Sequence, residues 1–156
     1  MSITGCISKF VFDGEFRDKV KFLKKVSLFE GLTDRALGKL TGIMHSKKYS
    51  AGEAVFHEGQ EGKLLYIVRS GEAEVTKGGS PIGRFGEGEF FGEMALLEEL
   101  PRAATVTAVK DSELLLIYKV KFDELLENHP SAGVKVVKNL AAILSARVRQ
   151  LQSGRQ

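Results

Sequence analysis

The middle of the chain, residues 47–118, consists of short apolar runs interrupted by glycine-containing turns, and this pattern restricts the fold most. Turn signals recur about every 8 to 12 residues, which is typical of an antiparallel sandwich or barrel. Between the runs there is no helical stretch long enough to connect parallel strands. The pattern therefore predicts a compact antiparallel β-barrel over 47–118 and argues against a Rossmann-like sheet.

Two glycine-containing turns inside this region resemble hairpin connections. One is Ser70-Gly71, and the other is "KGGS" at residues 77–80. Short turns of this composition commonly join neighbouring antiparallel strands. We therefore expect a β-hairpin at each position.

Helical periodicity precedes the barrel over residues 15–45, and residues 1–14 are expected to form an N-terminal tail. Gly31 should end one helix, and Thr33 or Asp34 should cap the next. Apolar residues recur at helical spacing in both helices: Phe16, Val20, Leu23 and Val26 in the first, Leu37, Leu40 and Met44 in the second.

Helical periodicity returns after the barrel, over residues 120–152, with Pro130 at the boundary between two helices. The second helix carries an apolar seam at alternating spacings of three and four: Val134, Val137, Ala141, Leu144, Val148 and Leu151. The seam either packs on the chain's own barrel or meets the same helix of a second copy, as in a homodimer. We expect residues 15–152 to be a single domain and residues 153–156 to be a tail.

Composition excludes several classes of protein. The net charge of +3 is too small to indicate nucleic acid, and too few residues follow Leu151 for a DNA-binding winged helix. No run approaches the ~20 apolar residues of a membrane span, and the start lacks signal-peptide features. Cys6 is the only cysteine, which favours a cytoplasmic protein. The three histidines are scattered and no catalytic triad is evident, so neither a metal nor catalysis is expected.

The segment "FFGEMALLEELPRAATVTA", residues 90–108, raises the question of function because it places Arg102 between apolar runs. A buried arginine is costly unless an anionic group meets it, and that group is either Glu93 or a ligand. Gly92 permits close backbone approach, and a short helix from Glu93 would present free amides to an anion. Pro101 must end that helix. The segment is thus suited to hold a phosphate by amides and a guanidinium.

Glu93 has a separate role in this scheme, since a carboxylate beside a phosphate would repel it. A carboxylate is a strong hydrogen-bond acceptor and suits a ribose hydroxyl. One ligand with a phosphate and a ribose hydroxyl would satisfy both Arg102 and Glu93.

This segment resembles the phosphate-binding cassette of the cyclic nucleotide-binding domain, a family shared by protein kinase A regulatory subunits, the catabolite activator protein and cyclic nucleotide-gated channels. The resemblance extends over about residues 22–150 and implies an eight-stranded antiparallel jelly-roll barrel with N-terminal helices and two C-terminal helices. The cassette residues that match are Phe91, Gly92, Glu93, Met94, Ala95, Leu96, Pro101, Arg102, Ala103, Ala104, Thr105 and Val106.

The resemblance implies a role for each cassette residue. Glu93 would bind the ribose 2′-hydroxyl, Arg102 would pair with the cyclic phosphate, and the backbone amides of Ala95 and Ala103 would complete the cradle. Gly92 and Met94 would line the sugar. Glutamates 87, 89, 98 and 99 also surround the segment, and we expect the pair at 98 and 99 to face solvent.

The resemblance also implies a non-catalytic sensor. We expect binding to change its C-terminal helices and so to regulate a protein partner, either in trans or as part of a larger protein. Ala103 replaces the Thr or Ser that often follows the arginine in cGMP-selective relatives, so cAMP is favoured, although dual binding stays open. Arg147 and Arg149 are candidates to cap the base, and the alternative is that both are solvated. The alternative function is an interaction or dimerisation module that no longer binds nucleotide.

Overall fold

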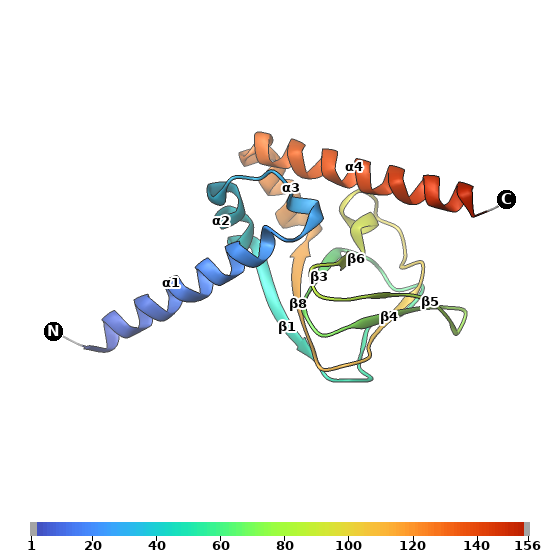
Figure 1. Cartoon of the computed structure of the whole chain (residues 1–156), viewed down its shortest axis with the longest axis horizontal. Helices are drawn as coiled ribbons and strands as arrows, with labels where there is room; N and C mark the ends of the chain where they lie inside the picture. Colours follow the sequence, from blue (N-terminus) through green and yellow to red (C-terminus); the bar gives the residue numbers. More distant parts are fainter. Residues whose placement is uncertain (1–2, 155–156) are drawn as a thin grey trace. The chain divides into compact units, whose positions relative to one another are not determined.

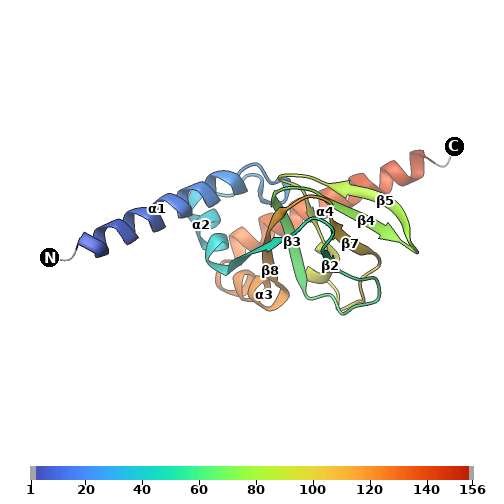
Figure 2. The same cartoon turned by 90° about the horizontal axis from the view of Figure 1, so that it is seen from below.

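The computed structural model describes the backbone of residues 3–154 and the side chains from Asp13 onward. The chain divides into two compact units. The helical unit combines the residues up to Gly42 with those from Leu125, and the β unit is Ile43–Glu124. Figures 1 and 2 show both units from two directions. Each unit is considered by itself below.

The β unit contains two four-stranded antiparallel sheets, in the orders β1-β8-β3-β6 and β2-β7-β4-β5. The strands are β1 (Met44–Tyr49), β2 (Ala54–Phe56), β3 (Leu64–Ser70), β4 (Ala73–Lys77), β5 (Ser80–Phe85), β6 (Phe90–Phe91), β7 (Thr105–Ala108) and β8 (Ser112–Tyr118). A one-turn 3₁₀ helix, η2 (Glu93–Leu96), follows β6. The eight-stranded antiparallel jelly roll is therefore confirmed, as two facing sheets without a continuous hydrogen-bonded closure.

The core of the β unit draws on both sheets, because each contributes the side chains of its inward face. Its buried residues are Tyr49, Tyr66, Val68, Ala73, Phe91, Val106, Ala108, Leu114 and Leu116. Removing this much apolar surface from water is the main stabilising contribution to such a fold. Tyr66 and the cassette residue Phe91 stack with ring centroids 5.2 Å apart.

One of the two predicted hairpins is confirmed. Gly78 and Gly79 connect β4 to β5, with Lys77 opposite Ser80, and both glycines have positive φ. This is the backbone that a two-residue hairpin turn requires.

The hairpin predicted at Ser70-Gly71 is wrong, because β3 and β4 belong to different sheets. The chain crosses from one sheet to the other at Gly71, whose φ is +92°. A Cβ there would lie 2.7 Å from the carbonyl oxygen of Asp111 and would collide with the Ser112 hydroxyl. The glycine marked a tight crossing that local sequence does not distinguish from a hairpin.

The helical unit contains α1 (Ile3–Leu23), the 3₁₀ turn η1 (Ser27–Phe29), α2 (Asp34–Ile43), the end of α3 (Lys119–Asn128) and α4 (Pro130–Ser153). Because α1 begins at Ile3, residues 3–14 belong to a helix rather than to the expected tail. Met44 begins β1 and does not continue the second helix. Thr33 is the residue that caps α2, since its hydroxyl accepts the amide of Ala36 at 3.2 Å.

Helix α4 buries a different face from its apolar seam. Gly133, Val136 and Leu140 are its buried residues, and the Asn139 amide donates to the carbonyls of Leu28 and Glu30 at 3.0 and 2.9 Å. The seam residues Val148 and Leu151 are 52% and 71% exposed. None of the described helices has an apolar stretch of the length needed to cross a membrane.

Candidate functional site

Arg102 is held at its backbone by the loop at residues 57–62. The Arg102 amide donates to the carbonyl of Gln60 at 2.7 Å, and the amide of Gly59 donates to the Arg102 carbonyl at 2.8 Å. Pro101 forms an isolated bridge with Glu61. These contacts set the direction of the Arg102 side chain before β7 begins.

The guanidinium of Arg102 is buried, with 8% of the residue exposed. Its Nη2 donates to the carbonyl of Leu64 at 2.8 Å, and its Nη1 makes a long contact of 3.5 Å with the carbonyl of Gly92. Among the described residues, its Nε is the only buried side-chain nitrogen or oxygen without a hydrogen-bond partner. Buried polar groups are normally paired, so this unpaired donor is an exception that calls for an explanation.

Aromatic rings lie against the guanidinium. The Cζ atom of Arg102 is 4.2 Å from the ring centroid of Phe56 and 5.5 Å from that of Tyr66. Such cation–π contacts stabilise a buried arginine without using its N–H donors. We did not predict either ring from the sequence, because β2 and β3 approach Arg102 only in the folded β unit.

Burial lowers the pKa of Arg102, whereas the neighbouring Tyr66 hydroxyl and the Glu93 carboxylate act in the opposite direction. Burial likewise raises the pKa of the Tyr66 phenol. Both directions follow from removing polar groups from water. The same loss of water strengthens the attraction between the guanidinium and an anion.

Two glycines provide the space that Arg102 occupies. A Cβ on Gly62 would lie 3.1 Å from the Arg102 Nε, and a Cβ on Gly92 would lie 2.7 Å from its Nη1. Gly92 also has a φ of +76°, in the left-handed region that side chains disfavour. Gly92 had been predicted from the cassette, whereas Gly62 had not.

The 3₁₀ turn η2 begins at Glu93. Glu93 and Ala95 are buried, with 8% of Glu93 exposed, whereas Met94 is 47% exposed. The amide of Ala95 donates to the carbonyl of Gly92 at 3.1 Å. Ala103 is exposed. The β unit thus brings Gly92 and Glu93 to Arg102, and it places an exposed Ala103 immediately after the arginine.

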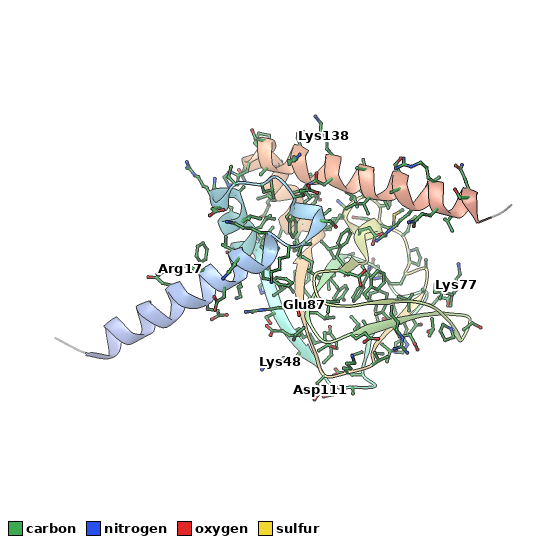
Figure 3. The ribbon with its side chains drawn as sticks, in the orientation of Figure 1. Arg17, Lys48, Lys77, Glu87, Asp111 and Lys138 are labelled. Carbon is green, nitrogen blue, oxygen red and sulfur yellow. The ribbon has the colours of Figure 1, made fainter. Side chains whose placement is uncertain are left out.

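Arg147 and Arg149, the candidate base caps, lie on α4 in the helical unit. Arg149 is exposed, and its Nη1 donates to the Ser145 hydroxyl at 2.8 Å. The glutamates around the cassette, at 87, 89, 98 and 99, are all exposed. Exposure was expected for the pair at 98 and 99. Figure 3 labels Glu87. Glu89 accepts the amide of Gly86 at 2.7 Å and so stabilises a turn.

Comparison with known proteins identifies the family of this chain. Residues 46–129, more than half of the chain, match the family model described as cyclic nucleotide-binding domain. The chain belongs to this family, and the matched residues include every cassette residue that surrounds Arg102.

Two relatives illustrate the match. The cAMP-dependent protein kinase regulatory subunit of Hypocrea atroviridis is 36% identical over 105 residues, which is 67% of this chain and 23% of that protein. The cGMP-dependent protein kinase of Toxoplasma gondii is 35% identical over 113 residues, 72% of this chain and 11% of that protein. This chain therefore spans less than a third of the length of either relative.

A co-crystal structure of the regulatory domain of Toxoplasma gondii PKA with cAMP has a similar fold, with a TM-score of 0.69 and 27% identity. The similarity covers 81% of this chain and 50% of that chain. It extends beyond the cassette to most of the elements described above.

Proposed function

We propose that this chain is a non-catalytic cytoplasmic sensor that binds cAMP in preference to cGMP. The observation that carries the proposal is the buried Arg102 guanidinium, whose Nε has no hydrogen-bond partner and whose charge lies near Glu93. A cyclic phosphate would meet the guanidinium, and the ribose 2′-hydroxyl would donate to Glu93. Charge-assisted hydrogen bonds of this kind are stronger than neutral ones.

The backbone would complete the phosphate cradle through the amides of Ala103 and Ala95. The second of these currently donates to the Gly92 carbonyl at 3.1 Å, so ligand binding requires it to be shared or redirected. Gly92 and Met94 would line the sugar, since Gly92 carries no side chain and Met94 is exposed.

The preference for cAMP rests on Ala103, which lacks a hydroxyl that could bond guanine. One hydrogen bond contributes about 0.5 to 1.5 kcal/mol, so the expected preference is about two- to tenfold. Relatives named for each nucleotide match this chain, and both ligands therefore belong in the test.

Calorimetric titration of cAMP and cGMP into protein purified free of bound nucleotide tests the proposal. We expect both nucleotides to bind saturably, and we expect cAMP to bind more tightly than cGMP. Absence of any binding would instead favour an interaction module that has lost its ligand. Tighter binding of cGMP would leave the site intact and contradict only the cAMP preference.

We further propose that binding changes the C-terminal helix α4, with Arg147 or Arg149 contacting the base, and that this change regulates a protein partner in trans. A ligand can drive such a change only through its different affinities for the two states.

Amide hydrogen exchange across residues 131–152 measures this change directly. We expect cAMP to slow or speed exchange there by at least about threefold, because a shift of that size requires only ~0.7 kcal/mol of differential affinity. An Arg102→Ala variant treated with the same cAMP concentration is the control. Identical exchange in the wild type with and without cAMP contradicts the coupling.

The exposed seam of α4 favours a homodimer through this helix. Leu151 is 71% exposed, and apolar seams of this spacing commonly pair with a second helix. Leu151→Glu should weaken the dimer at least about tenfold, because the apolar contact is lost from both copies. Sedimentation velocity measures the effect, with Gln150→Glu as the control for added charge off the seam. A wild type that stays monomeric at high concentration contradicts the proposal.

A further inference from the structure

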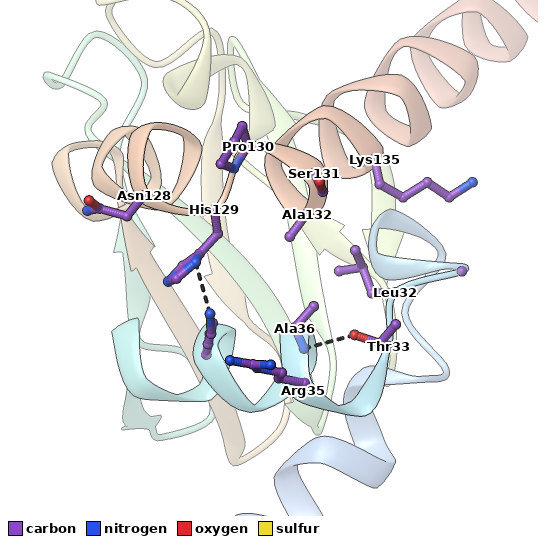
Figure 4. Close-up of a pocket in the computed structure, with 12 residues that line it drawn as sticks. Leu32, Thr33, Arg35, Ala36, Asn128, His129, Pro130, Ser131, Ala132 and Lys135 are labelled. Atoms are coloured by element: carbon purple, nitrogen blue, oxygen red, sulfur yellow. Dashed lines mark hydrogen bonds between the residues drawn. The ribbon is translucent and has the colours of Figure 1, made fainter.

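The helical unit contains a cavity of about 560 Å³, which includes none of the cassette residues (Figure 4). It lies between the start of α2 and the junction of α3 with α4. Three cationic side chains and one imidazole line it: Arg35, Lys39, Lys135 and His129. None of the described residues that line it is acidic.

The positive charges of the cavity have no ion-pair partner among the side chains of residues 13–154. Among the described residues, no carboxylate lies within ion-pair distance of Arg35, Lys39 or Lys135. Asp34, at the start of α2, is paired with Lys24 at 2.8 Å. Uncompensated charges of one sign around a concave surface attract the opposite charge.

Lys39 is held in the cavity wall by His129, since its Nζ lies 2.9 Å from the imidazole Nδ1 (Figure 4). An ammonium can only donate, so the ring nitrogen Nδ1 is the acceptor in this contact. The contact positions the ammonium and leaves its charge in place.

The walls of the cavity are fixed by packing within the helical unit. A Cβ on Gly31 would lie 2.8 Å from the Lys135 Cε, so the stem of Lys135 crosses directly over that glycine. Asn139 ties α4 to the turn at Leu28 through a hydrogen bond of 3.0 Å. A preformed cavity binds with a smaller entropic cost than one that must first be ordered.

Apolar surface lies beside the charges. Leu32, Ala36, Pro130 and Ala132 line the same cavity. A small inorganic anion would use only the cations, whereas a peptide with acidic residues flanking an apolar side chain would use both kinds of surface. We propose that this cavity docks an acidic, apolar-containing segment of a protein partner. All its residues lie in the helical unit and none belongs to the cassette, so the inference can be tested without nucleotide.

Fluorescence anisotropy with a labelled 12-residue peptide of alternating Glu and Leu, titrated with the full chain at low ionic strength, tests this inference. We expect saturable binding that Lys135→Glu weakens about tenfold, or ~1.4 kcal/mol. Lys138→Glu is the matched control, because Lys138 is exposed on the same helix, projects from it (Figure 3) and does not line the cavity. It should weaken binding less than Lys135→Glu does, because Lys138 does not line the cavity and so makes no direct contact with the peptide.

Three results would overturn the inference. The first is no binding of the Glu–Leu peptide, and the second is an equal loss in both variants, which would indicate the overall charge of the chain. The third is equal binding of an all-Glu peptide, or full displacement by millimolar inorganic phosphate, either of which would indicate a simple anion site. Lys135 is exposed, and circular dichroism verifies that its variant remains folded.

Discussion

Arg102→Ala should reduce the affinity for cAMP by about 30-fold to several thousand-fold, because truncating one partner of a buried charge pair costs about 2–5 kcal/mol. The guanidinium is the cationic group at the centre of the cassette, and its Nε has no partner within the chain. No neighbouring lysine or arginine is expected to replace it. Isothermal titration calorimetry with cAMP measures the loss.

Arg84→Ala is the matched control for this experiment. Arg84 is an arginine of the same β unit, but it is exposed on β5 and pairs with Glu72 and Glu74 at 2.7 and 3.0 Å. Its loss should change cAMP affinity less than about twofold, since exposed ion pairs contribute little. If Arg102→Ala retains wild-type affinity while folded, the phosphate does not bind where we propose.

The stability of the Arg102→Ala variant must be measured alongside its affinity. The substitution leaves the Leu64 carbonyl without its donor and removes the cation beside Phe56. An unsatisfied buried group costs about 1–3 kcal/mol, and urea unfolding of both proteins reports this cost. When the cAMP affinities of the two proteins are compared under conditions where both are fully folded, the difference reports the contribution of the charge.

Gly92→Ala should weaken cAMP binding at least about 30-fold, which corresponds to ~2 kcal/mol. The new methyl group would lie 2.7 Å from the Arg102 Nη1 and 3.0 Å from the carbonyl oxygen of Leu64. The guanidinium must move, and with it the contact we propose for the phosphate. Side chains at a φ of +76° also cost about 1–2 kcal/mol of folding stability.

Gly52→Ala separates the two effects of that substitution. Gly52 has a similar φ of +85°, yet a Cβ there would meet nothing within 4 Å. Both variants should therefore lose similar stability from backbone strain, whereas only Gly92→Ala should lose nucleotide affinity. Calorimetry and urea unfolding of the two proteins test this difference. Equal affinities would show that Gly92 is needed only for the turn.

Local sequence was sufficient to predict a structural feature wherever the residues that form the feature are neighbours in the chain. The Gly78-Gly79 hairpin, the Thr33 cap and the start of α4 at Pro130 all depend on backbone preferences within a few residues. Ser70-Gly71 carries an equally strong turn signal, yet it connects different sheets. A turn signal reports that the chain reverses and does not identify which strand will pair.

The N-terminal boundary was missed for a different reason. Ile3, Ile7 and Phe10 recur at spacings of four and three in the sequence, a pattern that we gave no weight when assigning residues 1–14 as a tail. Helix α1 begins at Ile3. Helical periodicity was therefore present in the segment that we expected to be a tail.

The sequence by itself determined the cassette, because Gly92, Glu93 and Arg102 are defined by residue type and spacing within one short segment. Only the tertiary structure decided what surrounds the arginine. The Leu64 carbonyl and the Phe56 ring come from other strands, and their positions depend on the pairing of the two sheets. Backbone preference acts over a few residues, whereas burial and packing act between segments far apart in the chain, and no single segment encodes them.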